Sequence, residues 1–218
     1  MQSSIIKSSS KAILRFPPGF YRPEIFVSQI EIFRKEKVAQ TLVDLNQHVD
    51  LLKWKIEDFS DGNRKKNRQF KEKHGEFSLL SPSEFSEAYE ILRESRIRIG
   101  AKLSIEKERL ENEIKKQNGI YKMFGTKINN KIASVAITVQ IDEVTEYVLY
   151  WGDTLEYRSL SPVVSLFIGL REYFLDQSIN ILDLGVSSVK GVTNIGLSRF
   201  KKNLGAIESE RITLEILI

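Results

Sequence analysis

The chain contains no cysteine. Disulfide bonds, thiolate catalysis and thiolate metal sites are therefore excluded, and the composition is compatible with a cytoplasmic location. Histidine is scarce, because only His48 and His74 are present and neither lies near a matching pattern of Asp and Glu, so we expect no metal site. No apolar run approaches the ~20 residues that a membrane-spanning helix needs. Residues 1–11 are rich in serine and lack the apolar core of a secretory signal.

The composition is otherwise that of an ordinary soluble protein, with 41% apolar and 28% charged residues. A chain of 218 residues can form one large domain or two small ones. The net charge is +4, and the excess is concentrated in a predicted helix at residues 63–74, where NRKKNRQFKEKH holds six Lys or Arg against one Glu. This segment is either a solvated helix face or a site for the phosphate groups of a nucleotide, a nucleotide-sugar, a coenzyme or RNA. Its candidate phosphate-binding residues are Arg64, Lys65 and Arg68.

Residues 1–75 are predicted to form an N-terminal extension that packs on the main domain. Residues 29–33 alternate between polar and apolar, and residues 38–45 are rich in strand-forming side chains, so we expect a β-hairpin with a charged turn at residues 34–37. This hairpin should pair with or cap the main sheet. Asn46 is expected to cap a helix whose apolar positions are Val49, Leu52, Trp54 and Ile56.

Residues 76–218 show a regular order of predicted elements. The pattern predicts strands at 76–80, 120–128, 131–141, 145–151, 181–185 and 209–218, and helices at 81–100, 104–117, 161–176 and 194–204. The order is therefore β-α-α-β-β-β-α-β-α-β. An antiparallel meander followed by a βαβ crossover predicts an α/β fold, with a mixed sheet that carries helices on both faces.

Four segments in this order resemble the FemAB-like branch of the GNAT acyltransferases, which includes polysaccharide-associated acetyltransferases. They are IYKMFGTKINNKIASVAITVQI at 120–141, EYRSLSP at 156–162, ILDLG at 181–185 and GLSRFKKNLGA at 196–206. Upstream, NRKKN and KHG resemble the basic helix of the same branch. The resemblance covers roughly residues 42–216. It implies a GNAT-like acyl-CoA N-acyltransferase fold with an N-terminal β-hairpin and helix extension.

The resemblance also implies an activity. We expect transfer of an acyl group, such as acetyl, from a thioester donor to an amine on a sugar or peptide, in cell-envelope or polysaccharide biosynthesis. The co-substrate would be acetyl-CoA or another acyl-CoA, with no permanently bound cofactor, and the acceptor an amino sugar or a peptidoglycan precursor. The oligomeric state is left open.

One departure from the GNAT pattern keeps two alternatives open. Residues 152–162 lack the glycine-rich pyrophosphate loop, Arg/Gln-x-x-Gly-x-Gly/Ala, that ordinary acetyltransferases carry there. The N–H groups of a helix N-terminus can still bind a phosphate, but close backbone approach is harder without the glycines. The donor is then either an acyl-CoA held differently or an aminoacyl-tRNA, as in FemAB-type peptidyltransferases. The third hypothesis is a non-catalytic binding domain.

Acyl transfer to an amine requires a cradle for the carbonyl oxygen, a positioned amine and a path for its proton. The fold implies a cleft where the strands at 145–151 and 181–185 diverge. The resemblance matches Phe200 and Lys201 to a Phe-Lys pair whose lysine is thought to assist the transition state. Asp183, inside an apolar strand, and Asp153 are the candidate carboxylates, although a buried Asp183 also suits an architectural role.

The remaining candidates would bind substrate or co-substrate. Arg158 is a candidate anchor for a phosphate or carboxylate, and could alternatively donate to Asp183. Tyr150 and Trp151 are candidates to stack on a sugar or an adenine, and Phe200 either contacts the ligand or belongs to the core.

Overall fold

A computed structural model describes residues 11–34, 38–116 and 119–217. Their contacts divide the chain into two compact units. The larger unit comprises His48–Gly185 and Arg199–Ile207. The smaller unit is made of the described parts of Met1–Gln47, Val186–Ser198 and Glu208–Ile218. The predicted domain boundary at residue 75 stays a prediction.

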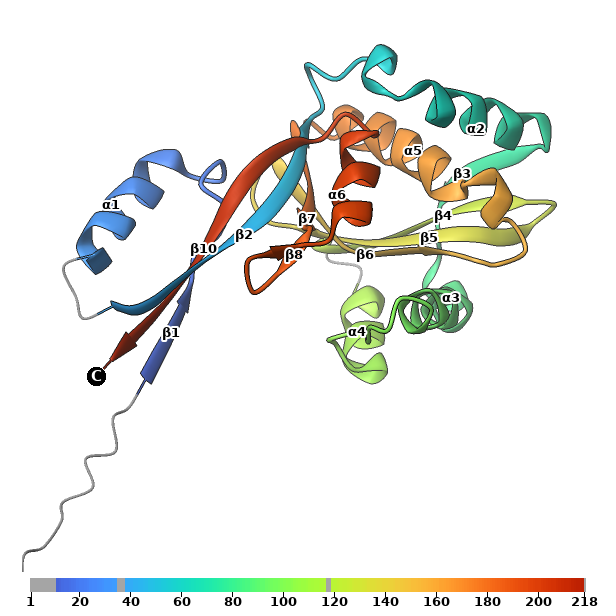
Figure 1. Ribbon diagram of the computed structural model, residues 1–218. Helices are drawn as coiled ribbons and strands as arrows, with labels where there is room; N and C mark the ends of the chain where they lie inside the picture. The colour runs from blue at the N-terminus through green and yellow to red at the C-terminus, as the bar shows by residue number, and fades with distance from the viewer. Residues whose placement is uncertain (1–10, 35–37, 117–118, 218) are drawn as a thin grey trace, which may run out of the picture. The chain divides into compact units, whose positions relative to one another are not determined.

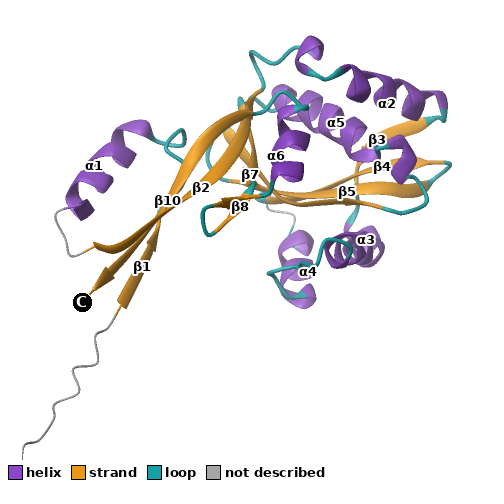
Figure 2. Ribbon diagram, in the orientation of Figure 1, coloured by secondary structure: helices purple, strands orange, loops and turns teal. Residues whose placement is uncertain are grey.

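The larger unit is built on a mixed sheet with the strand order β7-β6-β5-β4-β3 (Figure 2). Its strands are β3 (Gly75–Leu79), β4 (Tyr121–Ile128), β5 (Lys131–Gln140), β6 (Thr145–Asp153) and β7 (Ile181–Val186). The strands from β3 to β6 run antiparallel to one another, and β7 pairs with β6 in parallel. This confirms the predicted meander followed by a crossover.

Helices cover both faces of this sheet (Figure 1). On one face lie α3 (Phe85–Ile97) and α4 (Lys107–Lys115), where Leu92, Leu110 and Ile137 belong to one apolar cluster. On the other face lies α5 (Pro162–Asp176), whose Phe167 and Phe174 pack in a second cluster. The helix α2 (Asp61–Glu72) packs against α5. Short 3-10 turns lie at η1 (Ile56–Asp58), η2 (Pro82–Glu84) and η3 (Arg158–Leu160).

Local sequence signals explain several element boundaries. Asn129 and Asn130 form the tight β4–β5 turn at φ +50° and +63°, a conformation that asparagine tolerates better than most residues. The Ser60 hydroxyl accepts a hydrogen bond from the Asn63 N–H at 3.3 Å and so caps α2. A side chain at Gly169 would place its Cβ 2.2 Å from the Phe77 ring, so glycine permits α5 to approach β3 closely.

The smaller unit has the strand order β1-β10-β2, with β1 (Lys11–Arg15) antiparallel to β10 (Ile207–Leu217). It also contains α1 (Pro23–Arg34) and most of β2 (Val38–Asp50). A small hairpin follows β7 and pairs β8 (Ser188–Val189) with β9 (Val192–Thr193). The helix α6 (Ile195–Lys202) begins in the smaller unit and ends in the larger one.

The structure corrects two predictions for the N-terminal extension. Residues 29–33 lie in helix α1, so the predicted hairpin does not form. The alternation was misleading because Phe26, Ile30 and Phe33 also have helical spacing, and Pro23 and Glu24 suit the first turn of a helix. The predicted turn includes residues 35–37, which lie outside the described part. The second predicted strand is confirmed as part of β2, which neighbours β10.

The predicted helix after Asn46 is also wrong, because β2 continues to Asp50. Within residues 49–52 the buried apolar residues are Val49 and Leu51, which have the two-residue spacing of a strand, whereas Leu52 is 68% exposed. The polar pair Asn46 and Gln47 interrupts the apolar pattern, so the strand could not be recognised from hydrophobic spacing alone.

Candidate functional site

Strands β6 and β7 pair only over their first residues. The paired positions are Thr145 with Ile181, Glu146 with Leu182, and Tyr147 with Asp183, although β6 continues to Asp153 and β7 to Val186. Two residues after Tyr147, a β-bulge leaves Leu149 without a partner on β5, because Ile137 pairs with Tyr150 and Thr138 with Val148. Bulges bend a strand and are common beside active sites. The strands therefore stop pairing where the sequence predicts a cleft, and the cleft stays a prediction.

The side chain of Lys201 reaches the end of β7. Only 2% of Lys201 is exposed, and its Nζ donates a hydrogen bond to the Gly185 carbonyl oxygen at 2.7 Å. Gly185 has φ +76°, a conformation that is strained for residues with a side chain. A Cβ added at Gly185 would lie 3.1 Å from Tyr147 Oη, so contact with the neighbouring strand also restricts this position to glycine.

Burial gives Lys201 an unusual acidity. It lowers the pKa of the Lys201 amine from 10.5 to about 7, because a charged ammonium loses its hydration there. The negative charge of Asp183 raises this pKa, and the positive charge of Arg96 lowers it further. At neutral pH, the amine is therefore present in both protonation states. Groups of this kind can exchange a proton during a reaction, and perturbed pKa values cluster at functional sites.

Asp183 supports this arrangement from within β7. The side chain is 1% exposed, and its Oδ1 accepts a hydrogen bond from the Gly185 N–H at 2.8 Å. The carboxylate thus holds the residue whose carbonyl accepts from Lys201. Burial lowers the pKa of half-buried His48, while the charges of Asp183 and Asp50 act in the opposite direction. Asp183 therefore influences the protonation of two basic groups.

The two predicted aromatic binding residues on β6, Tyr150 and Trp151, lie on opposite faces of the sheet. The Trp151 ring contacts the Phe200 ring edge-on, with centroids 5.6 Å apart, which places it beside the helix that carries Lys201. Tyr150 points to the α3–α4 side, because successive side chains of a strand alternate. Its Oη lies 2.6 Å from Ser104 Oγ and accepts from the N–H groups of Ser104 and Ile105 at 2.9 and 3.1 Å. Tyr150 thus holds the segment before α4.

Asp153 and Arg158 are not brought together with Lys201 by any contact in the described residues. Asp153 pairs with Arg98, whose guanidinium lies 2.6 Å from Asp153 Oδ1 and 2.5 Å from its carbonyl oxygen. Arg158 is exposed in η3. The Asp183 carboxylate accepts from the Gly185 N–H, and its predicted contact with Arg158 stays a prediction.

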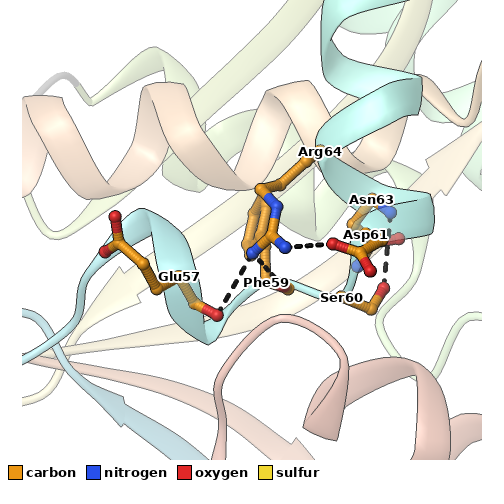
Figure 3. Close-up of polar contacts among 6 residues, drawn as sticks. All are labelled: Glu57, Phe59, Ser60, Asp61, Asn63 and Arg64. Atoms are coloured by element: carbon orange, nitrogen blue, oxygen red, sulfur yellow. Dashed lines mark hydrogen bonds and ion pairs between the residues drawn. The ribbon is translucent and has the colours of Figure 1, made fainter.

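The predicted phosphate-binding residues of the basic helix α2 differ in their surroundings, because one makes contacts near its own helix and two are exposed. Arg64 donates to the carbonyl oxygens of Phe59 and Glu57 at 2.8 and 3.3 Å and pairs with Asp61 (Figure 3). It therefore stabilises the turn before its own helix. Lys65 and Arg68 are exposed, so their role in phosphate binding stays a prediction.

Sequence reasoning missed three residues that act on Asp183, Lys201 or Gly185, namely His48, Arg96 and Tyr147. His48 was assigned to a helix that does not exist. Interpreting residues 46–50 as a strand would have placed His48 on a strand instead. Arg96 and Tyr147 carry no motif, because their proximity to Lys201 and Gly185 arises only from tertiary packing.

No protein-family model and no curated protein match the sequence. Solved structures match its fold. FemX aligns with a TM-score of 0.66 and 14% identity over 80% of this chain and 61% of its own. L-PGS from Bacillus licheniformis aligns with a TM-score of 0.65 and 13% identity over 86% of this chain and 64% of its own. The ribosomal-protein-S18-alanine N-acetyltransferase from Escherichia coli aligns with a TM-score of 0.50 and 16% identity over 66% of this chain and 94% of its own.

The chain has the GNAT-like fold. The predicted fold class and the FemAB-like resemblance are confirmed at the level of fold, which is what similarity at these identities establishes. The chain spans less than two thirds of the FemX and L-PGS chains that it matches. Within the described ranges, no group of three His, Cys, Asp or Glu side chains is placed to hold a metal ion. No helix among the same residues is long and apolar enough to cross a membrane.

Proposed function

We propose that this GNAT-like chain is an acyltransferase that N-acylates an amine beside the diverging ends of β6 and β7. The observation that carries the proposal is the buried Lys201 amine, which has a pKa of about 7 and is held at the end of β7 by the Gly185 carbonyl. A buried cationic side chain without a function would be costly, because the ammonium loses hydration. A proton-exchanging role accounts for keeping a lysine at this position.

In the proposed reaction, the acceptor amine attacks the acyl carbon and a new C–N bond forms. The neutral Lys201 amine takes the proton that the attacking nitrogen loses. The resulting ammonium stabilises the negative charge on the tetrahedral oxygen and then returns the proton to the leaving group as its bond to the acyl carbon breaks. Asp183 favours the ammonium electrostatically and orients Gly185. Trp151 and Phe200 supply an apolar surface beside the helix that carries Lys201.

A thioester such as acetyl-CoA is the first proposed donor. One solved structure with this fold is the ribosomal-protein-S18-alanine N-acetyltransferase. The bulge at Leu149 and the end of pairing between β6 and β7 leave β6 backbone groups without strand partners, and such groups can bind an extended ligand. The acceptor would be an amino sugar or a peptide amine.

An aminoacyl-tRNA donor is the second candidate. Two observations favour it: η3 occupies the interval where a glycine-rich pyrophosphate loop would lie, and Lys65 and Arg68 present exposed positive charge on α2. One fold neighbour is the C-terminal domain of a "Putative Lysylphosphatidylglycerol Synthetase" from Agrobacterium fabrum, with a TM-score of 0.62 and 8% identity over 94% of this chain and 68% of its own. For this donor, too, the proposed setting is cell-envelope synthesis in the cytoplasm.

The first experiment measures donor binding by calorimetry and turnover by release of free thiol from acetyl-CoA. Because the chain has no cysteine, a thiol-reactive dye reports only the coenzyme product. With acetyl-CoA and a panel of amino sugars and peptides, we expect thiol release that Lys201→Met abolishes and Lys202→Met leaves unchanged. The rate constant kcat/KM should rise with pH through about 7, following deprotonation of Lys201.

Two other outcomes would redirect the proposal. Binding of aminoacyl-tRNA that weakens steeply with salt, together with no binding of acyl-CoA, would favour the tRNA-dependent reaction. Transfer by Lys201→Met at the wild-type rate with either donor would show that Lys201 has no chemical role. Absence of binding and transfer with every donor would favour a non-catalytic binding domain.

A further inference from the structure

The smaller unit contains a cavity of about 760 Å³ that the acyl-transfer chemistry does not use. Its floor is one face of the strands β1, β10 and β2. Arg15 pairs with Thr213 across β1 and β10, and Arg211 lies two residues from Thr213, so these three side chains share a face. Leu42 of β2 lines the same cavity, and the β8–β9 hairpin forms a wall with Lys190.

Asp44 ties the hairpin to this face. Its Oδ1 accepts hydrogen bonds from Ser188 Oγ at 2.6 Å and from the Gly191 N–H at 3.0 Å. Its Oδ2 lies 3.4 Å from a terminal nitrogen of Arg211. The carboxylate is thus largely engaged in holding the hairpin, and its contact with Arg211 is a long one.

Arg211 retains donor capacity toward the cavity. Arg211 lines the cavity with a side chain that is 32% exposed, and among the described residues this side chain makes one hydrogen bond, the long contact with Asp44. A guanidinium presents a planar fork of donors that matches a carboxylate in two parallel hydrogen bonds. A guanidinium in the wall of a cavity, with most of its donors unpaired among the described residues, therefore suits a ligand carboxylate.

The lining also limits the charge and shape of the ligand. Its cations are Arg15, Lys190 and Arg211, and its anions are Asp44 and Glu215, which leaves a net charge of one positive unit. This balance suits a singly charged carboxylate better than a doubly charged phosphate. The apolar side chains of the lining include Ile13, Leu42 and Val189, and the first and last of these are 61% and 73% exposed.

We propose that this cavity binds a carboxylate attached to an apolar group, with Arg211 as its principal anchor. Two sources share this chemistry: a small carboxylic acid such as an N-acylated apolar amino acid, and the free C-terminus of a peptide. The proposal is independent of the acyl-transfer proposal, because its site, its residues and its readout are different.

Titration of the full chain with N-acetylleucine, followed by NMR and calorimetry, tests the proposal. We expect binding of N-acetylleucine, much weaker binding of the neutral N-acetylleucinamide, and resonance changes in the β8–β9 hairpin and β10. A tripeptide with a C-terminal leucine distinguishes the two sources, because a peptide-specific site will bind it more tightly than the single amino acid. Binding should weaken as salt is added.

Arg211→Gln should reduce the affinity roughly tenfold or more, because a charge-assisted hydrogen bond is lost. Arg109→Gln, an exposed arginine of α4, is the matched control and should bind normally. Because Arg211→Gln also removes the contact with Asp44, Lys190→Asn provides a second variant. Lys190 is exposed at φ +51°, which asparagine tolerates, so this change removes one cavity charge without straining the hairpin.

The proposal is overturned if N-acetylleucine does not bind at millimolar concentration or if the amide binds equally well. Unchanged affinity in both Arg211→Gln and Lys190→Asn would also exclude this cavity as the site. Stronger binding of inorganic phosphate than of either carboxylate would show that the charge argument is wrong.

Discussion

Lys201 Nζ lies 2.7 Å from the carbonyl oxygen of Gly185, and the two residues come from the helix α6 and the strand β7. The backbone at Gly185 is held in turn by the Asp183 carboxylate at its N–H. The position and the protonation of the amine thus depend on one short stretch of strand and on the burial of one helix face.

The first prediction concerns stability and pH. Folding lowers the Lys201 pKa from 10.5 to about 7, so between these values the unfolded chain binds a proton that the folded chain does not. The free energy of unfolding should therefore rise with pH above about 7, by up to about 1.4 kcal/mol per pH unit from this residue. Urea unfolding over about pH 6 to 9 measures the slope.

Lys201→Met should lose this pH-dependent contribution and be more stable than the wild type below about pH 7, because it buries no charge. Lys202→Met, at the adjacent exposed lysine, is the control and should keep the wild-type slope. Identical slopes in the wild type and Lys201→Met would show that the Lys201 pKa is not lowered in the folded protein.

The second prediction concerns Gly185. Gly185→Ala introduces a Cβ at φ +76° and 3.1 Å from Tyr147 Oη. We expect a loss of about 1–3 kcal/mol in the free energy of unfolding, from backbone strain and crowding. Acyl transfer should fall as well, since the carbonyl that holds Lys201 must move. Gly196→Ala is the matched control, because a Cβ there comes no closer than 3.5 Å to Asn194 and the position is helical.

The third prediction concerns the C-terminal end of α6. Trp54 Nε1 donates to the Leu204 carbonyl oxygen at 2.8 Å, and the Trp54 ring lies under the Arg171 guanidinium at 4.8 Å. Trp54→Phe keeps an aromatic ring but leaves that carbonyl unsatisfied, so we expect about 1–3 kcal/mol of destabilisation. Thermal and urea unfolding measure this change. If kcat falls further than the folded fraction explains, Trp54 also positions Lys201.

The fourth prediction separates structural from chemical roles for Asp153. The Arg98–Asp153 pair is 17% and 18% exposed, so removing one partner leaves a partly buried charge unpaired. A double-mutant cycle with Arg98→Met and Asp153→Asn should show a coupling energy of about 1–3 kcal/mol in unfolding. Asp153→Asn should retain transfer activity in the folded fraction. Complete loss of activity without loss of stability would instead support the predicted proton-accepting role.

Short-range signals in the sequence accounted for much of the larger unit. The turn at Asn129 and Asn130, the proline at the start of α5 and the runs of strand-forming residues in β4 to β6 are local, so the order of elements followed from them and matched the structure. Where two local patterns competed, the sequence misled. Residues 29–33 suit both a strand and a helix, and only packing distinguishes the two.

The candidate site was also predicted in part from the sequence, and the rest of it required the folded structure. Residue identity and the resemblance were enough to select Lys201, Phe200 and Asp183 on neighbouring elements, because the strand, loop and helix that carry them are contiguous in the chain. The loss of hydration that lowers the Lys201 pKa required the folded structure, since it depends on the atoms that surround the amine. So did the pairing of Asp153 with Arg98. Long-range packing, which single-sequence patterns do not encode, determines which neighbours each side chain meets.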